Sequence, residues 1–126
     1  MPRTKSLDTR AVQDFLKTVY TLQSQSERVS TNRLAKGLSI SAPSVTDMAA
    51  RLSTDGLLDY RKHHGVRLTE AGERAAQEIV RRHEWIEQFL VRDLGFTPDE
   101  AHLEAEQMEH VVSKRLIDAL EVKLST

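Results

Sequence analysis

The chain has 126 residues, 39% of them hydrophobic and 29% charged, a composition that predicts one globular domain or two small ones. It contains no cysteine, which excludes disulfides, thiolate zinc sites and cysteine nucleophiles and leaves carboxylate and imidazole as the strong metal ligands. No apolar run reaches the roughly 18 residues of a transmembrane helix, and residues 1–10 lack the apolar stretch of a signal peptide, so we expect a cytoplasmic protein without a membrane partner.

The net charge of −1 is unevenly distributed along the chain. Residues 1–75 carry 12 Lys and Arg against 8 Asp and Glu, whereas residues 76–126 carry 6 against 11. The basic first part is therefore the candidate for contact with nucleic acid. The acidic second part would repel itself unless something positive neutralised part of its charge, and a bound cation is one way to do so.

Short helices are expected in the first part of the chain. Apolar residues recur with a helical period over Val12–Leu22, and a second, short helix should stop near Gly37. The stretch SISAPSVTDMAARLSTDGLL begins with serines and a proline suited to a helix start, and it predicts a third helix from about Ala42 to Ser53. Two short helices joined by a tight turn make a helix-turn-helix.

Two strand-like segments follow this helix-turn-helix directly. Leu57–Arg61 and Val66–Thr69 flank a turn closed by Gly65, which is typical of the wing of a winged helix. Thr69 is suited to cap the next helix, whose apolar side continues until Gly95 stops it.

A further helix is expected after Gly95. Thr97-Pro98-Asp99-Glu100 is typical of a capping box with proline at the first helical position, and we expect the helix to run from Pro98 to about Val112. The fold class predicted from all these elements is mainly α. A winged helix-turn-helix domain should occupy residues 1–75, and an α-helical domain, for which metal binding and dimerisation are argued below, should occupy residues 76–126.

The winged helix predicts DNA binding, with the helix Ala42–Ser53 in the major groove. Basic side chains of the wing would contact phosphates, and polar side chains at the helix start would reach base edges. The residues expected at DNA are Ser41, Pro43, Ser44, Thr46, Asp47, Arg51, Arg61, Lys62 and Arg67. Asp47 could accept a hydrogen bond from a cytosine amino group or exclude wrong sites. A winged helix that binds another protein is the alternative.

The segment EAEQMEH carries the pattern of a metal site. On a helix, Glu106, Glu109 and His110 would stand at i, i+3 and i+4 and project from one face. Such donors could hold a divalent cation, provided that a fourth ligand comes from elsewhere in the chain. The plainer interpretation is a solvated stripe of surface charge.

The order of these parts resembles the diphtheria-toxin-repressor family of metal-dependent transcriptional regulators, and within it the manganese transport regulators. The resemblance covers nearly the whole chain and is carried by DFLKTVYTL, by SAPSVTDMAARLSTDGLL with the wing and LTEAG, by RRHEWIEQFL and by EAEQMEHVVS. It implies a winged helix that binds operator DNA, a helical segment that forms the homodimer, and a divalent metal at their junction that activates repression.

The same resemblance implies a main metal site and its ion. The site would consist of Asp14, Glu106, Glu109 and His110. Carboxylates at Asp14 and Glu106 resemble the manganese branch, because the iron-responsive branch tends to have softer sulfur ligands there. Mn(II) is therefore the expected cofactor, and Fe(II) is the second candidate.

Two further features bear on the number of metal ions. Lys17 stands where manganese regulators often have a second carboxylate, which weighs against their paired-metal arrangement. His83, Glu87 and His102 match an ancillary metal site of the iron-responsive branch. The alternative for His83 is a capping or packing role.

The expected function is a Mn(II)-activated repressor of metal-uptake genes that binds palindromic operators as a homodimer, and not an enzyme. A metal-independent winged-helix regulator is the first alternative. A small metallohydrolase is the second, although no nucleophile signature supports it. We expect the dimer to form through apolar residues of the C-terminal helices, which offer more apolar surface than so short a segment can cover internally. These residues are Trp85, Ile86, Phe89, Leu90, Met108, Val111, Val112, Leu116, Ile117 and Leu120.

Overall fold

The computed structural model describes residues 10–24 and 27–125 of the chain. The chain divides into two compact units, unit 1 up to Gln77 and unit 2 from Glu78, and the division falls within the helix α5 (Glu70–Leu94). Among the described residues, no helix combines the length and the apolar character needed to cross a membrane.

Unit 1 begins with three helices, α2 (Arg10–Gln23), α3 (Thr31–Leu38) and α4 (Ala42–Thr54), in the order predicted for a helix-turn-helix. In α2 the fully buried side chains include Val12, Phe15 and Val19, and their spacing follows the helical period expected from the sequence. These side chains lie on one face of α2, and through this face the helix packs on the hydrophobic core of unit 1.

Three serines mark the start of α3, its end and the start of α4. Ser30 caps α3 by accepting a hydrogen bond from the backbone N–H of Arg33, and Ser41 caps α4 by accepting one from Ser44. The helix α3 ends at Leu38, and the left-handed residue after it is Ser39, with φ 57°. The helix thus stops near Gly37, as expected, but Gly37 lies inside it and Ser39 adopts the left-handed conformation.

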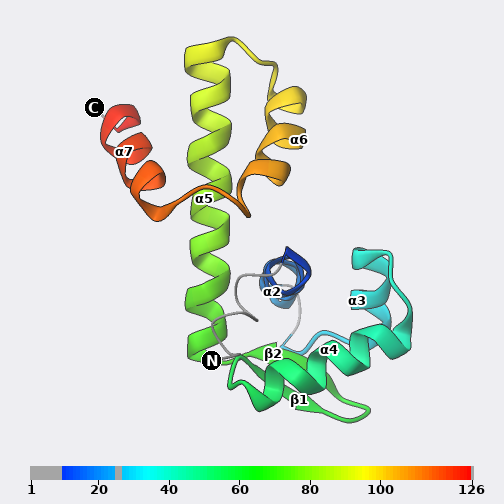
Figure 1. Cartoon of the computed structure of the whole chain (residues 1–126). Coiled ribbons are helices and arrows are strands. Elements are labelled where there is room, and N and C mark those ends of the chain that lie inside the picture. Colours follow the sequence, from blue (N-terminus) through cyan, green and yellow to red (C-terminus); the bar gives the residue numbers. More distant parts are fainter. Residues whose placement is uncertain (1–9, 25–26, 126) are drawn as a thin grey trace. The chain divides into compact units, whose positions relative to one another are not determined.

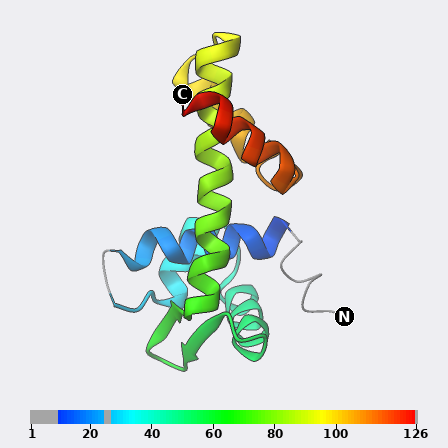
Figure 2. The ribbon, with the colours of Figure 1, turned by 90° about the vertical axis from the view of Figure 1, so that its left-hand side faces the viewer.

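The wing is an antiparallel hairpin of β1 (Leu58–Arg61) and β2 (Gly65–Leu68), which lies beside α4 in Figures 1 and 2. Val29 extends it, since its backbone N–H and carbonyl each pair with Val66 at 2.8 Å. Gly65 has φ 91°, and a Cβ there would lie 2.4 Å from the carbonyl oxygen of Val29. Only glycine can therefore occupy this position in the hairpin.

The first turn of α5 packs closely against the residue that precedes the wing. Thr69 caps this helix, and its hydroxyl accepts a hydrogen bond from the backbone N–H of Gly72 at 3.1 Å. A Cβ on Gly72 would lie 2.1 Å from the carbonyl oxygen of Leu57. Because Gly72 has no side chain, α5 can pack directly against the backbone of Leu57.

The hydrophobic core of unit 1 joins its helices to its wing. Buried side chains of α2, α3, α4, both strands and the start of α5 form one cluster, so the wing is held by the same core as the helix-turn-helix. Its largest fully buried members are Phe15, Leu16, Leu34 and Leu52. This packing confirms the predicted winged helix-turn-helix.

Unit 2 consists of the rest of α5, the helix α6 (Pro98–Met108) and the helix α7 (Lys114–Leu124). Figures 1 and 2 show α6 and α7 on opposite sides of the C-terminal part of α5. The predicted capping box is present, because Thr97 accepts from the N–H of Glu100 and the Glu100 carboxylate accepts from the N–H of Thr97. One buried cluster joins the three helices, and it contains Ile86, Leu90, Ala101, Ala105, Ile117, Leu120 and Leu124.

Unit 2 differs from the expectation in two respects. No bounds were predicted for α7, which Ser113 caps and whose buried side is formed by Ile117, Leu120 and Leu124. In addition, four of the apolar residues predicted at a dimer surface are buried in the core of the unit itself, namely Ile86, Leu90, Ile117 and Leu120. The large apolar side chains that unit 2 exposes are Val91, Leu94, Leu103, Val111, Leu116 and Val122.

Candidate metal centre and nucleic-acid interface

Three predicted ancillary ligands meet in unit 2, between α5 and α6. His83 and Glu87 stand one turn apart on α5, and His102 comes from α6. Oε2 of Glu87 lies 2.7 Å from Nε2 of His83 and 2.8 Å from Nδ1 of His102, while these two nitrogens are 3.1 Å apart. Each residue offers one ligand atom within 4.8 Å of the others, a spacing that a single cation can bridge.

The Glu87 carboxylate is ionised more readily than an ordinary glutamate. Burial acts in the opposite sense and raises its pKa, but hydrogen bonds from His102 and His83 outweigh burial and lower the pKa overall. The carboxylate therefore carries its negative charge at neutral pH and suits the binding of a cation.

Glu109 is the most deeply buried charged residue among those described, with 0% of its surface exposed. Its Oε1 lies 2.6 Å from Nδ1 of His83, and its Oε2 lies 3.4 Å from Nε2 of His110. His83 thus connects Glu109, a predicted main-site ligand, with Glu87 of the ancillary cluster. A carboxylate buried this deeply needs a positive partner in order to be ionised, and a cation or a protonated imidazole beside Glu109 would supply it.

The helix that carries these residues is shorter than expected. Helix α6 ends at Met108, not near Val112, and Glu109 is its C-cap. The backbone N–H groups of Val111 and Val112 both donate to the carbonyl of Met108, which closes the helix in a tight turn before α7 begins. The expected extension of this helix to about Val112 was therefore wrong, and His110 lies in the turn that follows α6.

Glu106 and Asp14 occupy different surroundings. Glu106 lies in α6, one helical turn after His102, and its Oε1 is 3.7 Å from Nε2 of that histidine. Asp14 belongs to unit 1, where it lies in α2 with Oδ2 3.7 Å from Nε of Arg10. Its participation in a site with Glu106, Glu109 and His110 stays a prediction.

The chemistry of these donors fits a divalent transition metal. Within unit 2 they are carboxylate oxygens and imidazole nitrogens, which suit Mn(II) and Fe(II) and exclude a thiolate site. A ring nitrogen that binds a metal is normally oriented by a carboxylate on the other ring nitrogen. His83, with Glu87 and Glu109 at its two nitrogens, is placed for such a role.

The predicted recognition helix presents its polar residues to solvent. All six candidates at this helix are exposed, and they are Ser41, Pro43, Ser44, Thr46, Asp47 and Arg51. The hydroxyl of Thr46 donates to the carbonyl of Ala42 at 3.1 Å, which leaves its oxygen available as an acceptor. The buried side chains of this helix, Val45, Ala49 and Leu52, fix which side it turns outward.

The wing exposes the three predicted basic residues, Arg61, Lys62 and Arg67. A pocket of about 520 Å³ lies between the wing, the start of α3 and α4. Lys62 and Thr46 both line it, as do His63, His64 and Asn32. A polar recess of this kind, next to the N-terminus of a helix, is suited to a phosphate oxygen.

Sequence reasoning missed Arg28, which organises the wing. Its Nη1 donates to the carbonyls of Asp59 at 3.0 Å and Gly65 at 3.1 Å, and its Nη2 pairs with the carboxylate of Asp59. One guanidinium thereby bonds both strands of the hairpin. The helical and strand periods give no signal for it, because Arg28 lies in the connection between α2 and α3.

A winged helix-turn-helix followed by a helical unit with clustered carboxylates and imidazoles defines a metal-dependent transcriptional regulator. The chain belongs to the iron-dependent repressor family. The model described as "Iron dependent repressor, N-terminal DNA binding domain" matches residues 9–66, and "Iron dependent repressor, metal binding and dimerisation domain" matches residues 69–126.

Curated relatives support this membership over most of their length. The chain is 33% identical to an uncharacterised HTH-type transcriptional regulator of Methanocaldococcus jannaschii, a match that covers 90% of this chain and 91% of the relative. It is also 33% identical to the HTH-type transcriptional regulator MntR of Lysinibacillus sphaericus, over 90% of this chain and 81% of that protein.

Solved structures resemble the chain as well. A structure described as a manganese-dependent transcriptional repressor in complex with manganese is 43% identical and superposes with a TM-score of 0.81, over 90% of this chain and 52% of that one. The manganese regulator SloR is 37% identical with a TM-score of 0.76, over 90% and 53%. The chain thus spans about half the length of these two solved relatives.

Proposed function

We propose that the protein is a Mn(II)-activated repressor, with Fe(II) as the second candidate ion, that acts in the cytoplasm on genes for metal uptake. The observation that carries the proposal is Glu109, a fully buried carboxylate between the imidazoles of His83 and His110. In a family of iron-dependent repressors, and beside relatives described as manganese regulators, this donor set is best explained as part of a regulatory metal site.

The main site of the proposal takes its ligands from both units. Asp14 would come from α2 of unit 1, and the others would be Glu106, Glu109 and His110 of unit 2. A bound divalent cation supplies the positive charge that these carboxylates need in order to lie together. His83, Glu87 and His102 would form the ancillary site.

Shared coordination explains how a metal ion controls DNA binding. With Asp14 held to ligands of unit 2, the recognition helix α4 is fixed relative to the dimerising helices. In a homodimer this sets the distance between two copies of α4, which must match half-sites about 34 Å apart or a multiple of that distance on palindromic DNA. Metal binding and operator binding must then strengthen each other by the same factor.

The homodimer in this proposal forms through unit 2. Val91 and Leu94 near the end of α5, with Leu103 of α6, expose apolar side chains that a partner subunit would cover. Sedimentation of the full chain at micromolar concentration should give the mass of a dimer. A monomer under these conditions would contradict this part of the proposal.

The test of the proposal compares operator affinity with and without Mn(II) for three proteins. The wild type should bind its operator more tightly with Mn(II), by a coupling of about 1–3 kcal/mol. Asp14→Ala should still bind Mn(II) through unit 2 and still dimerise, but should lose most of this gain. Glu109→Ala should lose both the binding of Mn(II) and the gain. A chelator without effect on wild-type DNA binding would instead favour a metal-independent regulator.

A further inference from the structure

The segment that follows α6 carries two predicted metal ligands and keeps only part of the helical hydrogen bonding, since the N–H of Glu109 bonds the carbonyl of Ala105 and that of Val112 bonds the carbonyl of Met108. Glu109 and His110 stand where α6 has ended, and α7 begins only at Lys114. The last carbonyl groups of a helix have no partner within it and must find other donors. The donors that bind these carbonyls therefore fix the position of the Glu109 backbone, from which its side chain projects.

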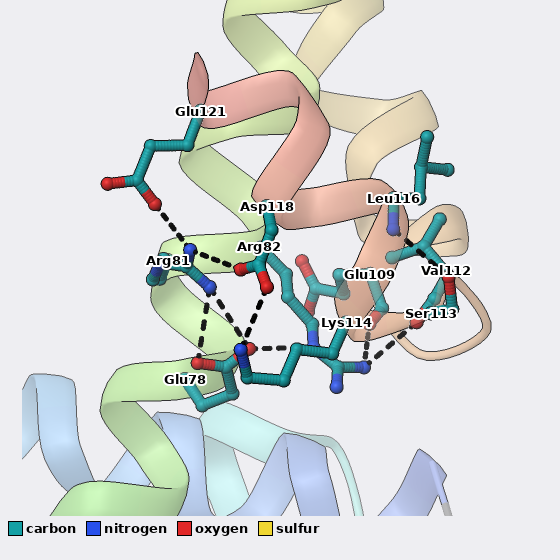
Figure 3. A network of polar contacts seen from close by, with 10 residues as sticks. All are labelled: Glu78, Arg81, Arg82, Glu109, Val112, Ser113, Lys114, Leu116, Asp118 and Glu121. Carbon is teal, nitrogen blue, oxygen red and sulfur yellow. Dashed lines mark hydrogen bonds and ion pairs between the residues drawn. The ribbon is translucent and has the colours of Figure 1, made fainter. Parts of the chain in front are cut away.

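Arg82 of α5 provides such a donor. Its Nη1 donates to the carbonyl oxygen of Val112 at 3.2 Å and, more distantly, to that of Glu109 at 3.5 Å. Its Nε donates to Oε2 of Glu78 at 3.3 Å, which fixes the guanidinium from the other side. Only 19% of the Arg82 side chain is exposed, so these contacts are largely shielded from water. Figure 3 shows Arg82 between Glu78 and the residues of this turn.

Arg82 and His83 are consecutive residues, and both contact Glu109. Their side chains leave the helix about 100° apart, as for any two neighbours on an α-helix. They reach Glu109 at different atoms, because Arg82 binds its main-chain carbonyl and His83 Nδ1 lies 2.6 Å from its Oε1. Glu109 is thus held at its backbone and at its carboxylate, with Oε2 turned toward His110.

Arg81 provides an internal comparison, since it precedes Arg82 and shares Glu78 with it. Arg81 pairs with the carboxylates of Asp118, at 2.9 Å, and Glu121, both on α7. These hydrogen bonds raise its pKa above the ordinary value for arginine. Figure 3 shows Arg81 facing α7, whereas Arg82 faces the turn at Glu109.

We infer that Arg82 is a positioning residue for the metal site. It binds no metal itself, but it orients Glu109 by fixing the carbonyls of the turn that carries this ligand. Metal ligands must be held to within about 0.5 Å of the productive geometry, and groups behind the ligands supply that precision. The inference rests on the proposed function, because it takes Glu109 to be a metal ligand.

The experiment measures Mn(II) affinity by titration and, separately, the free energy of unfolding without metal. Arg82→Met keeps the length of the side chain and removes its donors, and Arg81→Met is the matched control. Loss of a group behind a ligand typically weakens metal binding by about 10- to 100-fold, and we expect Arg82→Met to lie in this range. Arg81→Met should lower the stability while leaving Mn(II) affinity close to that of the wild type.

A conservative variant makes the test independent of folding. Arg82→Lys retains the charge and a donor but lacks the planar fork with which separate nitrogens of Arg82 reach Glu78 and the carbonyls, so its Mn(II) affinity should lie between those of Arg82→Met and wild type. Folded Arg82 variants that bind Mn(II) as tightly as the wild type would overturn the inference and leave the proposed function intact. A wild type that binds no Mn(II) would overturn both. If Arg82→Met does not fold, Arg82→Lys decides by the same criterion.

Discussion

Nδ1 of His83 lies 2.6 Å from Oε1 of Glu109, and the other nitrogen of the same ring lies 2.7 Å from Oε2 of Glu87. One imidazole therefore connects the two sets of predicted ligands. Both carboxylates are oriented by this ring. His83 should therefore affect metal binding at both predicted sites, whereas a ligand of the ancillary cluster alone would affect one.

Replacing His83 should affect two Mn(II) ions. His83→Phe keeps a planar ring and removes both nitrogens, so we expect each ion to bind more weakly, by about 10-fold or more at the site of Glu109. Glu87→Gln is the control, and it should weaken only one ion. Electron paramagnetic resonance of free Mn(II) during a titration measures both. The prediction fails if His83→Phe weakens the same single ion as Glu87→Gln.

The ancillary cluster can be tested by stoichiometry. His102→Ala removes a ligand contributed by α6 and should reduce the bound Mn(II) from two ions per chain to one, because Glu87 and His83 alone are too few ligands for tight binding. Glu104→Ala changes an exposed carboxylate on the same helix and should leave two ions. One ion bound by the wild type itself would show that the cluster is a hydrogen-bonded network without a metal.

The wing residues should control affinity for DNA without reading its sequence. Replacing Arg61, Lys62 and Arg67 together by alanine should weaken binding to all sequences. The slope of log affinity against log salt concentration should become shallower by about 0.9 for each phosphate that the wing no longer neutralises. Ser44→Ala on α4 should instead change sequence preference at constant slope. Fluorescence anisotropy at several salt concentrations measures both effects, and an unchanged slope in the triple variant means that the wing does not contact phosphates.

Asp118 should make stability depend on pH. Hydrogen bonds from Lys114 and Arg81 lower its pKa below the ordinary value of 3.8, so the unfolded chain binds a proton at Asp118 more readily than the folded one. Its stabilising contribution is complete above that ordinary value and is lost as the pH falls through the lowered one. We expect Asp118→Asn, in the presence of a chelator, to be less stable than wild type near neutral pH, with a difference that shrinks in acid. A difference that is constant over this range would contradict the pairing.

The fold was largely predictable because its determinants are local. Capping residues such as Ser41 and Thr97, and the apolar period of α2, specify helices through contacts with near neighbours in sequence. The end of α6 was not predictable in this way. Its helical pattern continues to Val112, but the backbone turns at Glu109, where the carbonyls bond to Arg82 of another helix.

The candidate site was predicted in its members and only partly in its arrangement. Residue type and spacing identified His83, Glu87 and His102, which the structure brings together. The link from His83 to Glu109 joins residues 26 positions apart, and no periodic pattern reports such a contact. The supporting arginines, Arg28 and Arg82, were missed for the same reason, since they act on backbone carbonyls that sequence patterns do not describe.

The close approach of Gly72 to the carbonyl of Leu57 limits how the protein can be engineered for heat resistance. Replacing a helical glycine with alanine ordinarily stabilises by about 0.5–1 kcal/mol, because the unfolded chain loses freedom. Gly37 is open to this strategy, since a Cβ there would lie 3.5 Å from Cγ2 of Thr18, in ordinary contact. At Gly72 the added methyl would collide with backbone at 2.1 Å and push the helix away from its support. A library that replaces both Gly37 and Gly72 with alanine would therefore combine a stabilising and a destabilising substitution in the same molecule.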